Sequence, residues 1–90
     1  MKVYSKPKKK MTLDQLANNI TMQVKSVRSF PDLPEISHQL EEIGFIVGES
    51  VTILRRNPVG GDPLIVRIGL STFALRKKEA SLIELEDLQQ

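Results

Sequence analysis

Residues 43–85, IGFIVGESVTILRRNPVGGDPLIVRIGLSTFALRKKEASLIEL, decide the fold of this 90-residue chain. Short apolar runs rich in Val, Ile and Leu alternate there with turn-forming residues, which is typical of strands. These runs predict strands at residues 51–56, 64–68, 71–76 and 82–86. The loop 57–63 contains two glycines between two prolines and needs a positive φ at a glycine, and Gly69 predicts a tight turn. This half of the chain is therefore predicted to be a set of strands joined by short turns.

The sequence before Ile43 adds one helix and one more strand. Residues 20–25 alternate apolar and polar side chains, as a half-buried strand does. Residues 32–43 predict a helix that Asp32 caps and Gly44 ends. Three apolar residues share one face of that helix, namely Ile36, Leu40 and Ile43.

Two short features complete the prediction of secondary structure. Thr12 and Gln15 match a capping box, which predicts one helical turn, and Asn18-Asn19 predicts a turn after it. Residues 77–81 predict a second helical turn just before the last strand. The whole pattern indicates a mainly β protein, a small five-stranded barrel with one helix near its N-terminal side. We expect a single domain over residues 11–86, a disordered leader at 1–10 and a frayed end at 87–90.

Charge is distributed unevenly along the chain. The leader holds five Lys and no acidic residue, whereas the other 80 residues hold eight basic and eleven acidic ones, for a net charge of −3. An acidic body argues against a dedicated nucleic-acid surface. The chain also has no cysteine and no apolar run of the roughly 20 residues that a membrane span needs. A cytoplasmic location is the default expectation.

The sequence offers little for catalysis or for metal binding. His38 with Glu41 and Glu42 is an incomplete ligand set, since transition metals usually take three or four well-placed ligands. Ser37 lies beside His38, but adjacent helix positions do not face each other. The Gly60-Gly61-Asp62 segment lacks the rest of a phosphate-binding loop. We therefore expect no enzymatic activity, no metal and no cofactor.

Two features suggest partner binding. Six basic residues lie in the strand-rich half: Arg55, Arg56, Arg67, Arg76, Lys77 and Lys78. Together with the lysine-rich leader they support an alternative function, that of a nucleic-acid-binding barrel. A weaker alternative is that the protein stimulates a GTPase directly through Arg56. Phe45-Ile46-Val47 gives three successive apolar residues between two glycines, which cannot all enter one small core. Exposed apolar residues rimmed by polar ones often mark a binding site.

The chain resembles the FeoA family in several segments that together run from about Thr12 to Glu86. These are residues 39–45 (QLEEIGF), 56–63 (RNPVGGDP) and 73–80 (FALRKKEA), with Gly48, Val51 and Val66-Arg67 at matching spacing. Two departures stand out, because the family often has Arg where Gln39 stands and Pro-Gly where Asn18-Asn19 stands. The same domain is similar to the C-terminal barrel of iron-dependent repressors of the DtxR type.

The resemblance implies an SH3-like barrel that is a cytoplasmic accessory protein of bacterial ferrous iron transport. It implies a partner, the cytosolic GTPase-containing part of the FeoB permease, and no catalytic residues. The recurring helix-end and loop positions of the family, with the apolar residues between them, give the candidate partner-binding set. These residues are Leu40, Gly44, Phe45, Ile46, Val47, Gly48, Gly60 and Asp62.

Overall fold

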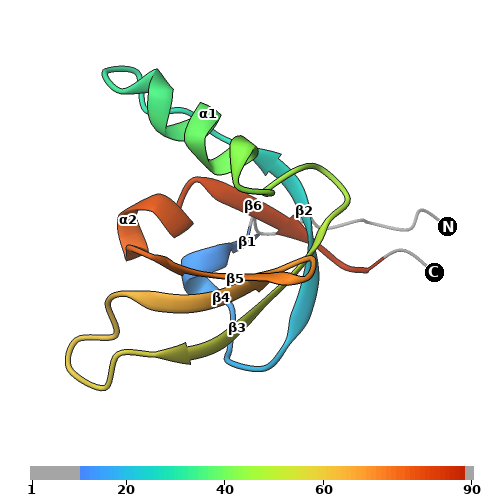
Figure 1. Ribbon diagram of the computed structural model, residues 1–90, viewed down its shortest axis with the longest axis vertical. Coiled ribbons are helices and arrows are strands. Elements are labelled where there is room, and N and C mark those ends of the chain that lie inside the picture. The colour runs from blue at the N-terminus through green and yellow to red at the C-terminus, as the bar shows by residue number, and fades with distance from the viewer. Residues whose placement is uncertain (1–10, 89–90) are drawn as a thin grey trace, which may run out of the picture.

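The computed structural model describes residues 11–88 and shows one antiparallel sheet with three short helices (Figure 1). In chain order the elements are β1 (Met11–Thr12), the 3-10 helix η1 (Leu13–Gln15), β2 (Thr21–Val27), α1 (Pro34–Glu42), β3 (Ser50–Arg56), β4 (Leu64–Ile68), β5 (Ser71–Leu75), α2 (Lys77–Ala80) and β6 (Ile83–Glu86). The six strands lie in the order β1-β6-β2-β3-β4-β5. The prediction of a mainly β domain is confirmed.

Strands β3, β4 and β5 form a meander in which two loops set the register. The β4–β5 turn has only two residues, and Gly69 at its first position has φ +57. The β3–β4 loop uses Gly60 and Gly61 at φ +78 and +71, as its glycine pair predicts. In β4 the buried residues alternate with less buried ones, so Leu64, Val66 and Ile68 face the core.

The sheet has six strands where five were predicted. Met11 and Thr12 pair with Leu85 and Glu84, so this short segment extends the sheet beside β6. The capping box between Thr12 and Gln15 is present, and η1 follows directly. A two-residue strand leaves no periodic pattern in the sequence, because its pairing depends on a partner more than 70 residues away.

Strand β2 is longer than predicted. It pairs with β3 at its start and with β6 from Gln23 to Val27, and a bulge between Val24 and Ser26 shifts the register. The alternation of apolar residues breaks at such a bulge, which is why the sequence suggested an early end. Beyond the bulge, Ser26 donates a hydrogen bond to the buried Glu84 (2.9 Å).

Helix α1 begins at Pro34 and packs its predicted face toward the sheet. Leu40 is buried, and Ile36 and Ile43 are partly buried against the core. The predicted cap, Asp32, is wrong: Leu33 occupies that position and makes no side-chain cap. Proline at the first helical turn explains how the helix begins without one, since proline needs no partner for a missing N–H.

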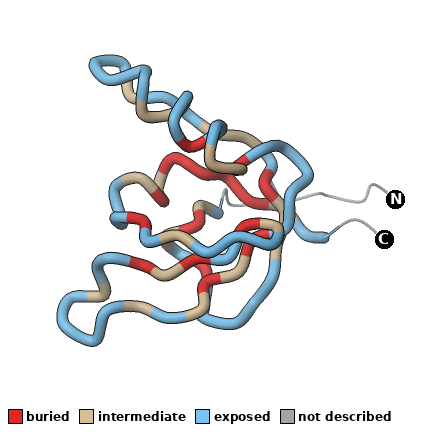
Figure 2. The backbone as a smooth tube through the Cα atoms, viewed as in Figure 1, coloured by how far each residue is buried: buried red, intermediate tan, exposed pale blue. Residues whose placement is uncertain are grey.

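The core lies inside the curled sheet and is made almost wholly of aliphatic side chains (Figure 2). Phe45 is its largest fully buried residue. The 3-10 helix η1, next to β1, contacts α2, which follows β5, so these two short helices meet across the two ends of the sheet. The leader and the last two residues lie outside the described part of the chain, and Asp87 and Leu88 form no helix or strand.

Candidate functional site

The segment from Gly44 to Gly48 turns sharply away from the end of α1. Gly44 adopts φ +122, a value that only glycine reaches without strain. The N–H of Phe45 donates to the carbonyl of Leu40 (3.0 Å), which closes the helix and directs the Phe45 ring into the core. The chain then leaves the core at once.

Ile46 and Val47 project from this loop into solvent. Their exposed fractions are 58% and 66%, whereas Phe45 beside them has none. The N–H of Glu49 donates to the Ile46 carbonyl (2.9 Å), and the N–H of Gly48 donates to the Val24 carbonyl on β2 (2.8 Å). The backbone of the loop is therefore held in place while its two apolar side chains stay uncovered.

A third exposed apolar residue, Leu70, lies at the same end of the molecule. The N–H of Gly69 donates to the Ser50 carbonyl (3.0 Å), and a Cβ at Gly69 would lie 3.3 Å from an oxygen of Glu49. The β4–β5 turn thus sits directly beside the end of the loop (Figure 1). Leu70 is fully exposed. We call Ile46, Val47 and Leu70 the loop surface.

Sequence reasoning missed Leu70. The signal was there, because a leucine at the tip of a two-residue turn stands where polar residues usually do. What the sequence did not reveal was that this turn and the Gly44–Gly48 loop lie side by side. That proximity comes from the long-range pairing of β3 with β4.

The other predicted partner-binding residues lie elsewhere. Leu40 and Phe45 are in the core, where they support the loop from beneath. Gly60 and Asp62 lie in the β3–β4 loop, at the opposite end of the sheet (Figure 1). There the Asp62 carboxylate accepts a hydrogen bond from the N–H of Lys77 (3.0 Å), which joins this loop to α2. The structure therefore brings together Gly44, Ile46, Val47 and Gly48 from the predicted set.

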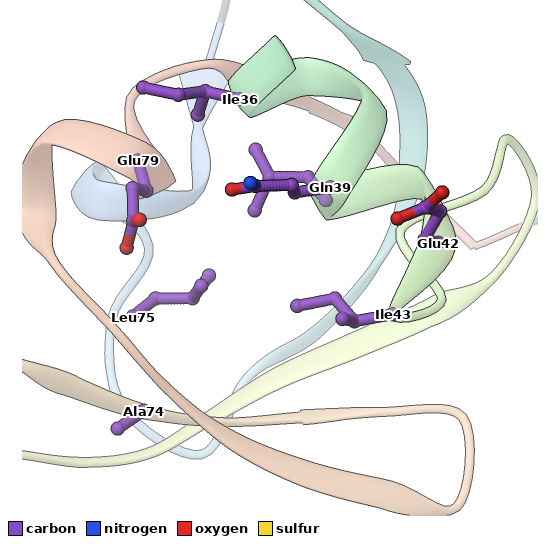
Figure 3. Close-up of a pocket in the computed structure, with 8 residues that line it drawn as sticks. Ile36, Gln39, Glu42, Ile43, Ala74, Leu75 and Glu79 are labelled. Carbon is purple, nitrogen blue, oxygen red and sulfur yellow. The ribbon is translucent and has the colours of Figure 1, made fainter.

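A groove lies between α1 and β5, with α2 at one side (Figure 3). Its volume is about 330 Å³. The floor is apolar and the rim carries two carboxylates and an amide. The lining residues are Ile36, Gln39, Leu40, Glu42, Ile43, Ala74, Leu75 and Glu79.

The family model for the FeoA domain matches residues 11–87. The chain belongs to the FeoA family. The match covers the sheet, all three short helices and the loop surface, and it leaves out the lysine-rich leader.

Solved structures of FeoA proteins share this fold. FeoA from Stenotrophomonas maltophilia, solved as a zinc complex and described as an SH3 domain protein, is 38% identical with a TM-score of 0.77, over 84% of this chain and 89% of that one. The iron(II) transport protein A from Clostridium thermocellum is 34% identical with a TM-score of 0.75, over 86% of this chain and 45% of that one. The predicted SH3-like fold is thus confirmed. The Clostridium protein is named as an iron(II) transport protein, and the Stenotrophomonas protein is described as a candidate ferrous iron transport activating factor.

A more distant structural match supports the fold and nothing further. The manganese regulator SloR is 17% identical over 84% of this chain and 34% of its own, with a TM-score of 0.65, which is in keeping with the expected likeness to metal-dependent repressors. A comparison with curated protein sequences gives no match. None of the helices within residues 11–88 has the length and apolar character of a membrane span.

The zinc in the Stenotrophomonas structure is a property of that protein. No group of three or more His, Asp or Glu side chains converges within residues 11–88 of this chain. His38 is exposed on α1, as are Glu41 and Glu42. Gly60-Gly61 leads into β4 rather than into a helix N-terminus, so it has no dipole to hold a phosphate.

The basic residues of the strand-rich half have different environments. Arg56 points inward, where its guanidinium donates to the carbonyls of Asp14 (3.0 Å) and Leu16 (2.6 Å) and to the side chain of Asn18. Arg55 is exposed on the neighbouring position, and Lys78 lies 5.4 Å from the centre of the Phe30 ring. With both guanidinium –NH2 groups of Arg56 engaged, this residue is poorly placed to reach into a GTPase.

Proposed function

We propose that this protein is a non-enzymatic accessory protein of ferrous iron transport that binds the cytosolic, GTPase-containing part of a FeoB-type permease through the loop surface. Membership of the FeoA family over residues 11–87 is the observation that carries the proposal. A cytoplasmic location follows from that partner.

The loop surface supports the assignment of the contact. Burying a Val, Leu or Ile side chain contributes about 1.5–3 kcal/mol, so three of them give a small interface a useful apolar centre. The hydrogen bonds of Gly48 and Glu49 fix the backbone beforehand, and a fixed loop loses little conformational entropy on binding. Glu49 at its edge adds a polar rim, which is typical of protein interfaces.

The proposal is tested by titrating the purified cytosolic domain of the permease with this protein in a calorimeter. We expect Ile46→Asp and Val47→Asp each to raise Kd at least tenfold, because a carboxylate would be desolvated in an apolar contact. Val59→Asp is the matched control. Val59 is 82% exposed in the β3–β4 loop at the opposite end of the sheet, so this change should leave Kd unaltered.

Both loop variants should retain the wild-type midpoint of urea unfolding, because their side chains are already in solvent. Val66→Asp puts a charge in the core and should unfold the protein. It therefore serves as the reference for a variant that fails to fold. Binding by folded Ile46→Asp and Val47→Asp at wild-type affinity would place the contact elsewhere. No binding by the wild-type protein would overturn the proposed partner.

A further inference from the structure

The outer edge of β5 is open within the described part of the chain. Strand β5 ends the sheet, and among residues 11–88 only β4 pairs with it. In a two-residue hairpin the closing pair, here Ile68 and Ser71, exchanges hydrogen bonds, and such pairs alternate along the two strands. Thr72 and Ala74 therefore direct their backbone N–H and C=O groups outward, away from β4.

This open edge borders the groove beneath α1 (Figure 3). Ala74 and Leu75 of β5 form one wall, and Ile36 and Ile43 of α1 form the other. A helix facing an open strand edge across an apolar groove is the arrangement in which an extended peptide adds a strand, with main-chain hydrogen bonds to the edge and side chains in the groove.

The charge on the groove favours a basic occupant. Glu79 at one end and Glu42 at the other are the only charged residues that line it (Figure 3). One oxygen of Glu79 accepts the N–H of Arg76 (2.9 Å), which fixes the carboxylate at the rim. Arg76 itself lines the neighbouring hollow, together with Asp62 and Glu79.

The chain carries a segment of matching chemistry in its leader. Residues 2–6 are Lys-Val-Tyr-Ser-Lys, with two residues of high β-propensity at the centre. In an extended conformation Lys2, Tyr4 and Lys6 share one face, and the two lysines lie about 13 Å apart on either side of the tyrosine. The two lysines would match the two carboxylates of the groove, and the aromatic ring between them would match its apolar floor.

We propose that residues 2–6 of a second copy of this chain add to β5 as a strand, with Tyr4 in the α1–β5 groove and its flanking lysines at Glu42 and Glu79. This is a self-association surface, separate from the loop surface and independent of the proposed function. The chain's own leader is the alternative occupant of the groove, and association that rises with concentration distinguishes a second copy from it.

Sedimentation velocity of the full chain over a range of concentrations tests the contact. We expect the wild-type protein to associate as its concentration rises. Tyr4→Ser removes the groove side chain, and Ala74→Pro removes an outward N–H. An edge strand tolerates proline where its N–H faces away from the neighbouring strand. Each variant alone should stay a monomer, and wild-type chains that stay monomeric throughout would overturn the proposal.

Mixing the two variants distinguishes loss of the intermolecular contact from misfolding of a variant. The Tyr4→Ser chain keeps its groove and the Ala74→Pro chain keeps its leader, so together they should form a heterodimer that neither forms alone. Two variants with wild-type circular dichroism that remain monomeric when mixed would contradict the strand addition.

The charge pairing has a matched control on the same helix. Glu42→Gln and Glu79→Gln should each weaken association at least fivefold in low salt, with a smaller effect in high salt because ions screen exposed charges. Glu41→Gln removes the same charge from an exposed position of α1 that does not line the groove, and should have no effect. Equal effects of Glu41→Gln and Glu42→Gln would reduce the contact to nonspecific attraction and overturn the assigned pairing.

Discussion

At the scale of single residues, Arg56 shows how a charged side chain takes a structural role. Its guanidinium holds two carbonyls of the η1 segment and the Asn18 side chain, so it ties β3 to the chain before β2. Arg55 beside it is exposed, whereas Arg56 is partly buried. The sequence alone did not show which of the two points inward, since that depends on carbonyl groups about 40 residues away.

We expect Arg56→Lys to destabilise the protein by about 1.5–3 kcal/mol, because a lysine ammonium cannot replace the planar fork that reaches all three acceptors. Urea unfolding measures the change. Arg55→Lys, on the exposed neighbour, should change the free energy of unfolding by less than about 0.5 kcal/mol. A similar cost for both substitutions would show that the contacts of Arg56 contribute little.

At the scale of elements, the sequence predicted most of the fold from local patterns. Strand β4 was predicted with its observed bounds, and α1 presents the expected apolar face, because in both cases the period of the apolar residues is regular. The misses share one cause. The short strand β1 and the bulged half of β2 owe their structure to pairing with the distant strand β6, which no local pattern records.

The β4–β5 turn gives the prediction that belongs to this scale. Gly69→Ala should destabilise the protein by about 1–2 kcal/mol, the cost of a side chain at a positive φ. It should also move Glu49, whose oxygen lies 3.3 Å from the new Cβ position. Thermal unfolding measures the first effect. Gly60→Ala has the same sign of φ and open space around it, so its cost should be the smaller of the two.

At the scale of the whole molecule, a single core joins both ends of the sheet. The sequence predicted the barrel and the apolar loop after α1, but it grouped Gly60 and Asp62 with that loop. The structure places them at opposite ends, because β3 carries the chain from one end to the other. Which loops share an end of a barrel is a property of topology, so the partner-binding set was only partly predictable.

A substitution at Phe45 tests whether the loop after α1 belongs to the same cooperative core as the sheet. Phe45 is fully buried, and Phe45→Ala should lower the free energy of unfolding by about 3–5 kcal/mol through the cavity it leaves. Unfolding should remain a single transition. Circular dichroism and proton chemical shifts follow it, and the fluorescence of Tyr4 is not used as a probe. Val47→Ala, two residues on, should be nearly neutral. A small cost for Phe45→Ala would mean that the loop contributes little to the core.

The remoteness of the β3–β4 loop from the loop surface has a practical consequence. Val59 is 82% exposed, and the chain has no native cysteine, so Val59→Cys creates a single thiol for labelling. A fluorophore attached there would report rotational motion while leaving Ile46, Val47 and Leu70 free. The same position suits immobilisation on a sensor chip, with the molecule oriented so that its opposite end faces the solution.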